Sequence, residues 1–184
     1  MPDNAWDVSA DKSGKVMAWA VQKDGGYDLY IGGEGGVAAN TKCNDLFNGY
    51  INATQILMNG NFHTENTTNM RAMFADCYSM TSVDLSDFNT SKVTDMRSMF
   101  SDCDSLKSVD LSSFDTSNVT TMKWMFYGSG SLERVDLSGF DTSKVTEAGA
   151  MFYVCYGLIE VDVSSFSSEL IDTMYIPDGV SVIR

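Results

Sequence analysis

At 184 residues the chain has the length of one domain, although a repeat array can reach this size by stacking units without a central core. Its 25 acidic residues outweigh 12 lysines and arginines, and the formal charge of −13 argues against nucleic acids and anionic membrane surfaces as partners. No apolar run approaches the roughly 20 residues of a membrane span, and residues 1–10 lack a signal-peptide pattern. We expect no direct membrane insertion, and the abrupt start also suits a segment of a longer secreted protein.

Residues 1–45 lie outside any repeat and are predicted to form an N-terminal capping segment. Two apolar and aromatic runs, Lys15–Val21 and Tyr27–Ile31, are separated by Asp-Gly-Gly, which is turn chemistry typical of a β-hairpin. The glycine-rich stretch 32–36 lacks the spacing and the Lys-Ser/Thr pair of a phosphate-binding loop, so we interpret it as a tight connection. Because a solenoid needs its open end covered, the hairpin is predicted to be an N-terminal cap.

The rest of the chain is dominated by a repeat with a period of 26 residues. The sequence of 109–126, VDLSSFDTSNVTTMKWMF, recurs with few changes at 83–100 and 135–152. A degenerate first copy begins near Leu46, and one extra residue before Phe62 shifts its register to 27. Self-similarity at such a period indicates a solenoid. We therefore predict four to five coils over residues 46–174, followed by a C-terminal cap at 175–184.

Each coil is predicted to contain a very short strand. In the Val-Asp-Leu triplets at 83–85, 109–111, 135–137 and 161–163, apolar residues alternate around an aspartate. A period of two suits a strand with Val and Leu pointing inward, and successive copies should pair in parallel. The side chains expected to be buried, together with their equivalents in other coils, are Met99, Phe100, Val109, Leu111, Phe114 and Val119.

Each coil is also predicted to contain a helix of about two turns. Apolar residues follow a threonine at steps of i, i+3, i+4 and i+7, as in Met96, Met99, Phe100 and Cys103 after Thr94. This spacing is typical of one helix face. Threonine is a good N-cap, and asparagine or an acid follows it in three copies, as suits the positive end of a helix. The predicted fold class is therefore α/β.

The repeats resemble those of the BspA-like family of bacterial leucine-rich-repeat surface proteins. The resemblance rests on the pattern LxxVDLSxFDTSNVTxMxxMF between Leu106 and Phe126 and covers about residues 46–174. It implies a right-handed leucine-rich-repeat-like solenoid, displayed on a bacterial cell surface or otherwise extracellular as part of a longer secreted protein. It also implies adhesion and host or matrix binding. Because members of the family differ in partner, the resemblance does not identify the partner of this chain.

The four cysteines occupy inward positions of the repeat. Cys77, Cys103 and Cys155 share one position, where Ser129 stands in the remaining copy, and Cys43 matches a core methionine position. Two interpretations stay open. The cysteines are buried structural thiols, or neighbouring coils allow a disulfide such as Cys77–Cys103. No zinc site is expected, because the sequence has no C-x-x-C and a single histidine.

An outward column of carboxylates is predicted on the strand face, made of Asp84, Asp110, Asp136 and Asp162. Hard cations bind carboxylate oxygens, so a cation ladder is one interpretation. The other is that serines and backbone donors hold each aspartate. Acid–base catalysis needs two carboxyl groups in unlike environments, whereas these four environments are nearly identical. We therefore expect no enzyme activity and no cofactor.

A binding site is predicted on the outward face of the third and fourth full copies. There Lys123, Trp124, Tyr127, Tyr153 and Tyr156 stand out against the small or polar residues of earlier copies. Exposed Trp and Tyr dominate the hot spots of interfaces. The same residues would alternatively cover the flank of the array or meet the C-terminal cap.

Two functions are compatible with this sequence. The first is a non-enzymatic cell-surface binding or adhesion module, monomeric, that recognises a protein or glycan partner. The alternative is a structural spacer, a stalk that displays other domains of a larger surface protein.

Overall fold

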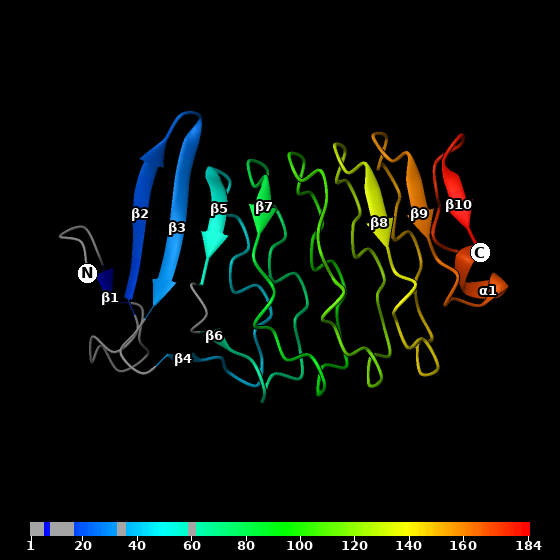
Figure 1. Ribbon diagram of the computed structural model, residues 1–184, viewed down its shortest axis with the longest axis horizontal. Coiled ribbons are helices and arrows are strands. Elements are labelled where there is room, and N and C mark those ends of the chain that lie inside the picture. The colour runs from blue at the N-terminus through cyan, green and yellow to red at the C-terminus, as the bar shows by residue number, and fades with distance from the viewer. Residues whose placement is uncertain (1–5, 8–16, 33–35, 59–61) are drawn as a thin grey trace.

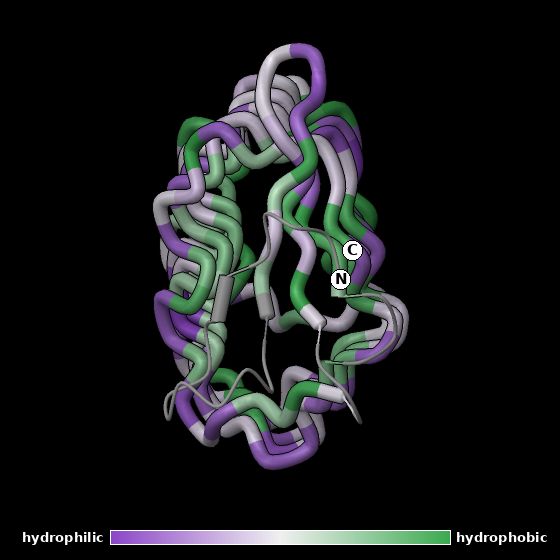
Figure 2. Tube along the Cα trace, turned by 90° about the vertical axis from the view of Figure 1, so that its left-hand side faces the viewer, coloured by the Kyte–Doolittle hydropathy of each residue, from purple (hydrophilic) through white to green (hydrophobic). Residues whose placement is uncertain are grey.

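The structure, a computed structural model, describes residues 6–7, 17–32, 36–58 and 62–184. The chain winds into a β-solenoid of about five turns, with its coils stacked along the long axis (Figure 1). Viewed along that axis, the coils superimpose as closed outlines of similar shape (Figure 2). The predicted repeat solenoid is therefore confirmed. The predicted loop at 32–36 and the extra residue before Phe62 fall largely outside the described residues.

The first sheet joins the N-terminal hairpin to the first coils. It contains five strands in the order β1 (Trp6–Asp7), β2 (Met17–Lys23), β3 (Gly26–Gly32), β5 (Ala53–Leu57) and β7 (Ser82–Val83). Strands β2 and β3 are antiparallel, and Gly25 between them has a φ of 85°. A two-residue hairpin turn requires such positive φ values, which glycine adopts without strain. The predicted hairpin is present, and β3 then pairs in parallel with β5.

The remaining strands form two smaller sheets. Strand β4 (Val37–Ala38) pairs in parallel with β6 (Phe62–His63). At the other end, β8 (Arg134–Asp136), β9 (Glu160–Asp162) and β10 (Ser181–Ile183) form a parallel sheet in the order β10-β9-β8. Val135 lies opposite Val161, so β8 and β9 pair in the register that the 26-residue period predicts.

The predicted strand column is interrupted in its middle. Residues 109–111 form no strand and lie between β7 and β8, which belong to different sheets. Leu111 is buried as predicted, but Val109 is only half-buried, as is the equivalent Val83 in β7. Parallel pairing continues on another side of the coils. There, single bridges link Lys42, Asn69, Asp95, Thr121 and Glu147 in turn.

The prediction of a helix in every coil was wrong. Within the described ranges the one α-helix is the four-residue α1 (Ser168–Ile171). In the stretch from Met96 to Phe100, alternate N–H groups donate to carbonyls of the next coil, at 3.1 Å for Met96 to Thr121 and 2.9 Å for Phe100 to Met125. A donor used between coils cannot also close the i to i−4 bond of an α-helix. The fold is therefore a β-solenoid rather than an α/β structure.

The threonines predicted as N-caps instead fasten one coil to the next. The Oγ1 atom of Thr94 donates to the carbonyl oxygen of Thr68 at 3.2 Å, and Oγ1 of Thr120 donates to that of Thr94 at 3.0 Å. The backbone N–H of each threonine reaches the same carbonyl at 2.9 Å. Each carbonyl thus accepts two hydrogen bonds from the following coil, which is a repeat-to-repeat contact rather than a helix start.

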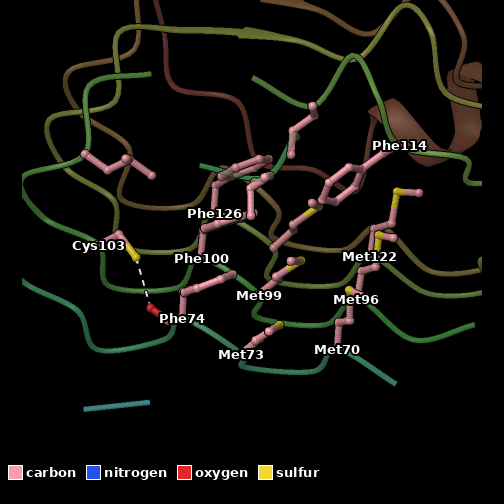
Figure 3. Packing of buried hydrophobic residues seen from close by; sticks show 14 of the residues in the cluster. Met70, Met73, Phe74, Met96, Met99, Phe100, Cys103, Phe114, Met122 and Phe126 are labelled. Atoms are coloured by element: carbon pink, nitrogen blue, oxygen red, sulfur yellow. Dashed lines mark hydrogen bonds between the residues drawn. The ribbon is translucent and has the colours of Figure 1, made fainter. Parts of the chain in front are cut away.

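The interior is filled by columns of identical side chains (Figure 3). Five phenylalanine rings, one per coil, lie with neighbouring centroids 5.4–5.7 Å apart and nearly parallel planes, and they are Phe47, Phe74, Phe100, Phe126 and Phe152. Methionine columns run beside them, and all these side chains are buried. Since each coil buries its apolar residues against the next, stacking supplies the core that no single coil could build.

Candidate functional site

A row of aromatic side chains, two of them exposed and Tyr127 half-buried, crosses the coils near the C-terminal end of the solenoid. The rings of Tyr127 and Tyr153 stack with centroids 5.7 Å apart. Tyr153 in turn meets Tyr175 edge-on, at 5.8 Å and an angle of 87°. Tyr153 is 47% exposed and Tyr175 is 64% exposed. We call Tyr127, Tyr153 and Tyr175 the aromatic row.

Trp124 lies beside this row and has an unusual backbone conformation. Its φ is 61°, in the left-handed region, and its side chain is 41% exposed. The equivalent positions in other coils share the positive φ but carry Ala72, Ser98 and Ala150. The Nζ atom of Lys123 lies 4.1 Å from the centroid of the indole ring, a cation–π contact.

Hydrogen bonds between coils hold the backbone of this region in place. The N–H of Trp124 donates to the carbonyl of Gly149 at 3.0 Å, and the N–H of Gly128 donates to that of Tyr153 at 2.9 Å. On the other side, the N–H of Asp102 donates to the carbonyl of Tyr127 at 2.7 Å. The aromatic side chains therefore project from a rigid framework, which lowers the entropy cost of binding.

A shallow hollow opens next to Trp124. It is lined by Ser98, Ser101, Asp102, Trp124 and Tyr127, so that two aromatic rings face a carboxylate and two hydroxyls. The hydroxyl of Ser101 donates to Oδ2 of Asp102 at 2.7 Å. This hollow combines the apolar walls and the few polar groups that small-molecule and side-chain pockets share.

Gly128 makes room for the carboxylate of this hollow. A Cβ atom at position 128 would lie 2.2 Å from Oδ1 of Asp102, closer than any van der Waals contact allows. Gly128 also has a φ of 75°. In the coils on either side, Asp102 and Val154 occupy the same repeat position with positive φ. Glycine at 128 is therefore required by the neighbouring carboxylate rather than by the backbone alone.

More carboxylates gather beside the hollow. Partial burial, followed by the charge of Asp102, raises the pKa of Asp104. A hydrogen bond from the Tyr78 hydroxyl to Asp76 raises the pKa of Tyr78, and the charges of Asp76, Asp102 and Asp104 add to this effect. Asp76, Asp102 and Asp104 thus share one negative region, which we call the acidic cluster.

The structure brings together most of the residues predicted for the site. Lys123, Trp124, Tyr127 and Tyr153 lie side by side, whereas Tyr156 is 81% exposed and makes no ring contact within the described residues. Sequence reasoning missed Tyr175, Asp102 and the rest of the acidic cluster. Tyr175 lies 22 residues after Tyr153 and therefore outside the 26-residue period, so no repeat signal pointed to it.

The aspartate column on the strand face is held by serines. The N–H of Ser112 donates to Oδ1 of Asp110 at 2.9 Å, and the same bond recurs in the other three copies. These serine donors lower the pKa of Asp84, Asp110 and Asp136. Shallow hollows flank the column. Among the described residues there is no group of three or more His, Cys, Asp or Glu side chains arranged to hold a metal ion.

All four cysteines are free and buried. Burial raises the pKa of Cys77 and of Cys155 to about 12 and that of Cys103 well above its ordinary value. The thiolate is the nucleophilic form, so these cysteines have the environment of inert structural thiols.

Comparison with known proteins gives one match. A family model described as "Mycoplasma protein of unknown function, DUF285" matches residues 41–166, more than half of the chain. No curated protein and no solved structure matches the chain. No helix in the described ranges is long and apolar enough to cross a bilayer.

Proposed function

The chain belongs to the DUF285 family of Mycoplasma proteins of unknown function, and from that premise we propose that it is a non-enzymatic binding module. It recognises a protein or glycan partner through Trp124, Lys123 and the aromatic row. One observation carries this proposal: Trp124 projects into solvent from a backbone position with positive φ.

Neither the backbone nor the core favours tryptophan at position 124. A left-handed conformation costs an L-residue roughly 1–2 kcal/mol, and it is a clear outlier for a bulky one. Core packing does not compensate, since 41% of the side chain remains in contact with solvent. The same positive φ recurs at Ala72, Ser98 and Ala150, so what sets this coil apart is the bulky residue held there. Trp and Tyr are also the residues that contribute most to interface hot spots.

We further propose the setting in which this module works. The repeat pattern resembles BspA-like leucine-rich-repeat surface proteins, which supports an extracellular or cell-surface location within a longer secreted protein. In this setting β2 and β3 serve as the N-terminal cap of the solenoid, because they cover the edge of β5 that would otherwise be open.

A capture experiment tests the proposal. The purified protein is immobilised and exposed to a panel of purified host-surface proteins and to a glycan array, alongside Trp124→Ala and Ile159→Ala variants. Ile159 is a matched control because it is also apolar and 51% exposed but belongs to the strand side of its coil. We expect Trp124→Ala to weaken capture by roughly tenfold or more, as for an interface hot spot, with a nearly unchanged melting temperature. Equal capture by both variants and the parent would contradict the proposal.

The alternative, a structural spacer, has its own supporting observation. The phenylalanine stack and the hydrogen bonds between coils run through all described coils without a break, as a stiff rod requires. A spacer binds nothing itself. It becomes the better explanation if neither the parent nor Trp124→Ala captures any protein or glycan.

A further inference from the structure

We propose that the hollow beside Trp124 receives a basic side chain, arginine or lysine, from a partner protein. This inference rests on the proposed function and specifies the chemistry of its ligand. In the bound state the cationic group pairs with Asp102. The rings of Trp124 and Tyr127 pack against the aliphatic stem of the basic side chain and against its charged group.

The acidic cluster has no counter-ion within the part of the chain that the structure describes. The ion pairs formed among the described residues do not involve Asp76, Asp102 or Asp104. Neutral groups donate to two of these carboxylates: Ser101 to Asp102 at 2.7 Å, and Tyr78 and Asn48 to Asp76 at 3.1 and 3.4 Å. Three carboxylates that share one region without a cation favour a cation from outside.

The hollow also has a geometry that suits a cationic group. The Asp102 carboxylate lies against the bare backbone of Gly128, with one oxygen held by Ser101, and the two rings stand beside it. Cationic groups bind the faces of Trp and Tyr, and arginine in particular combines ring stacking with hydrogen bonds to a carboxylate. The Nζ atom of Lys123 lies 4.1 Å from the centroid of the Trp124 ring, so this indole already contacts one cationic group.

A basic side chain fits this hollow better than a neutral sugar does. A sugar would use the aromatic rings and the hydroxyls, but it would leave the acidic cluster uncompensated. The whole chain carries a formal charge of −13, which attracts basic segments over distance and raises their association rate. Charge complementarity therefore selects a basic segment of a protein as the occupant.

The test uses two fluorescent peptides of the same length, hexa-arginine and hexa-citrulline. Citrulline has nearly the shape of arginine but no charge. Binding to the full chain is followed by fluorescence anisotropy at about 0.15 M salt, where charges more than roughly 8 Å apart are largely screened. We expect hexa-arginine to bind about tenfold more tightly than hexa-citrulline, a typical contribution of a charge-assisted contact.

Variants then separate the hollow from the general negative charge. Asp102→Asn and Trp124→Ala should each weaken hexa-arginine binding by roughly fivefold or more. Asp136→Asn removes the same charge from the strand face and should change it less than about twofold. The charge-matched pair Asp102→Asn and Asp136→Asn is decisive, because bulk attraction affects both equally.

A pair of glycine variants tests the geometry without changing any charge. Gly128→Ala places a Cβ atom where Oδ1 of Asp102 lies, so it should displace the carboxylate and weaken binding of hexa-arginine. Gly49 occupies the same repeat position in the first coil, with the same φ of 75° and no atom within 4 Å of an added Cβ. Gly49→Ala should therefore share the backbone strain but leave binding unchanged. A melting curve confirms that both variants are folded.

Several results would overturn the inference. They are the absence of hexa-arginine binding, equal binding of the two peptides, and equal losses for Asp102→Asn and Asp136→Asn. If a neutral glycan is captured through Trp124 while the peptides fail, this inference falls and the proposed function stands. If no ligand depends on Trp124, both fall.

Discussion

The Sγ atom of Cys103 donates a hydrogen bond to the carbonyl oxygen of Phe74 in the preceding coil, at 3.2 Å (Figure 3). Cys77 and Cys155 make the same bond one coil earlier and two coils later. In the intervening coil Ser129 does so through its hydroxyl, at 2.7 Å to Phe100. A buried carbonyl needs a partner, and here a column of thiols and one serine donates to these carbonyls, although that of Phe126 also accepts from the N–H of Ser129.

We predict that serine replaces Cys103 better than alanine does. Cys103→Ser keeps a donor for the Phe74 carbonyl, as Ser129 does in its own coil, and should cost less than about 1 kcal/mol of unfolding free energy. Cys103→Ala leaves that buried carbonyl without its donor and should cost roughly 1–3 kcal/mol. Urea denaturation of both variants measures the difference. A larger cost for serine than for alanine would show that burial of the hydroxyl dominates.

Acid should destabilise the protein through its aspartates. Hydrogen bonds from Ser86, first from its N–H and then from its hydroxyl, lower the pKa of Asp84 below its ordinary value. A lowered native pKa stabilises the fold above the unfolded pKa of about 3.9, and this stabilisation is lost as pH falls through the native value.

We therefore expect the melting temperature to fall steeply below about pH 4. Asp84→Asn removes one titrating group and should make that fall shallower. Ser86→Ala removes the hydroxyl donor, at 2.8 Å, but keeps the N–H, so its profile should lie between those of the parent and Asp84→Asn. Identical acid profiles for all three proteins would show that Asp84 contributes nothing to the acid sensitivity.

Much of this fold could be predicted because each residue pattern of a coil occurs in several copies. A position such as Phe100 recurs every 26 residues from Phe74 to Phe152, and stacked coils bring equivalent residues into contact, so the period alone places it in the core. The register of 27 in the first coil was also correct, since Ile56 pairs with Val83. The strand at 109–111 was not formed, although its sequence nearly repeats that of its neighbours.

Periodicity alone could not show whether each coil contains a helix. An i, i+3, i+4, i+7 pattern says which side chains share a face, and successive tight turns place Met96, Met99 and Phe100 inward as well as a helix would. What decides between a helix and successive turns is where the N–H groups find acceptors, and neighbouring coils provide those acceptors.

The candidate site, too, could be predicted only in part from the repeat. Trp124 was visible as a departure from the repeat, but Asp102 obeys the repeat and only the packing against Gly128 singles it out.

Truncating one ring of the phenylalanine stack should be severe. Phe100 is fully buried between Phe74 and Phe126, with centroids 5.5 and 5.7 Å away. Phe100→Ala opens a cavity within a column that cannot collapse without shifting whole coils, so we expect a loss of roughly 3–5 kcal/mol in urea denaturation. Tyr156→Ala, at an 81% exposed position, should change stability by less than about 0.5 kcal/mol. A small cost for Phe100→Ala would mean that the stack is not the core.

One substitution, Ala150→Gly, should change the stability in opposite directions depending on whether the coil is built of turns or is a helix. Ala150 has a φ of 52°, a conformation that disfavours any residue with a Cβ atom and that glycine adopts freely. Ala150→Gly should therefore stabilise the protein by up to about 1 kcal/mol, whereas in a helix interior it would destabilise by a similar amount.

Ala148 is the matched control for this prediction. It lies two residues earlier and is buried, and its φ is not positive. Ala148→Gly should destabilise the protein by about 1–2 kcal/mol, because it removes a buried methyl group and increases the conformational entropy of the unfolded chain. The midpoints of urea denaturation for the two variants should consequently move in opposite directions. If both move downward, the coil at 148–150 is helical in solution, and the left-handed positions that also hold Trp124 in place do not exist.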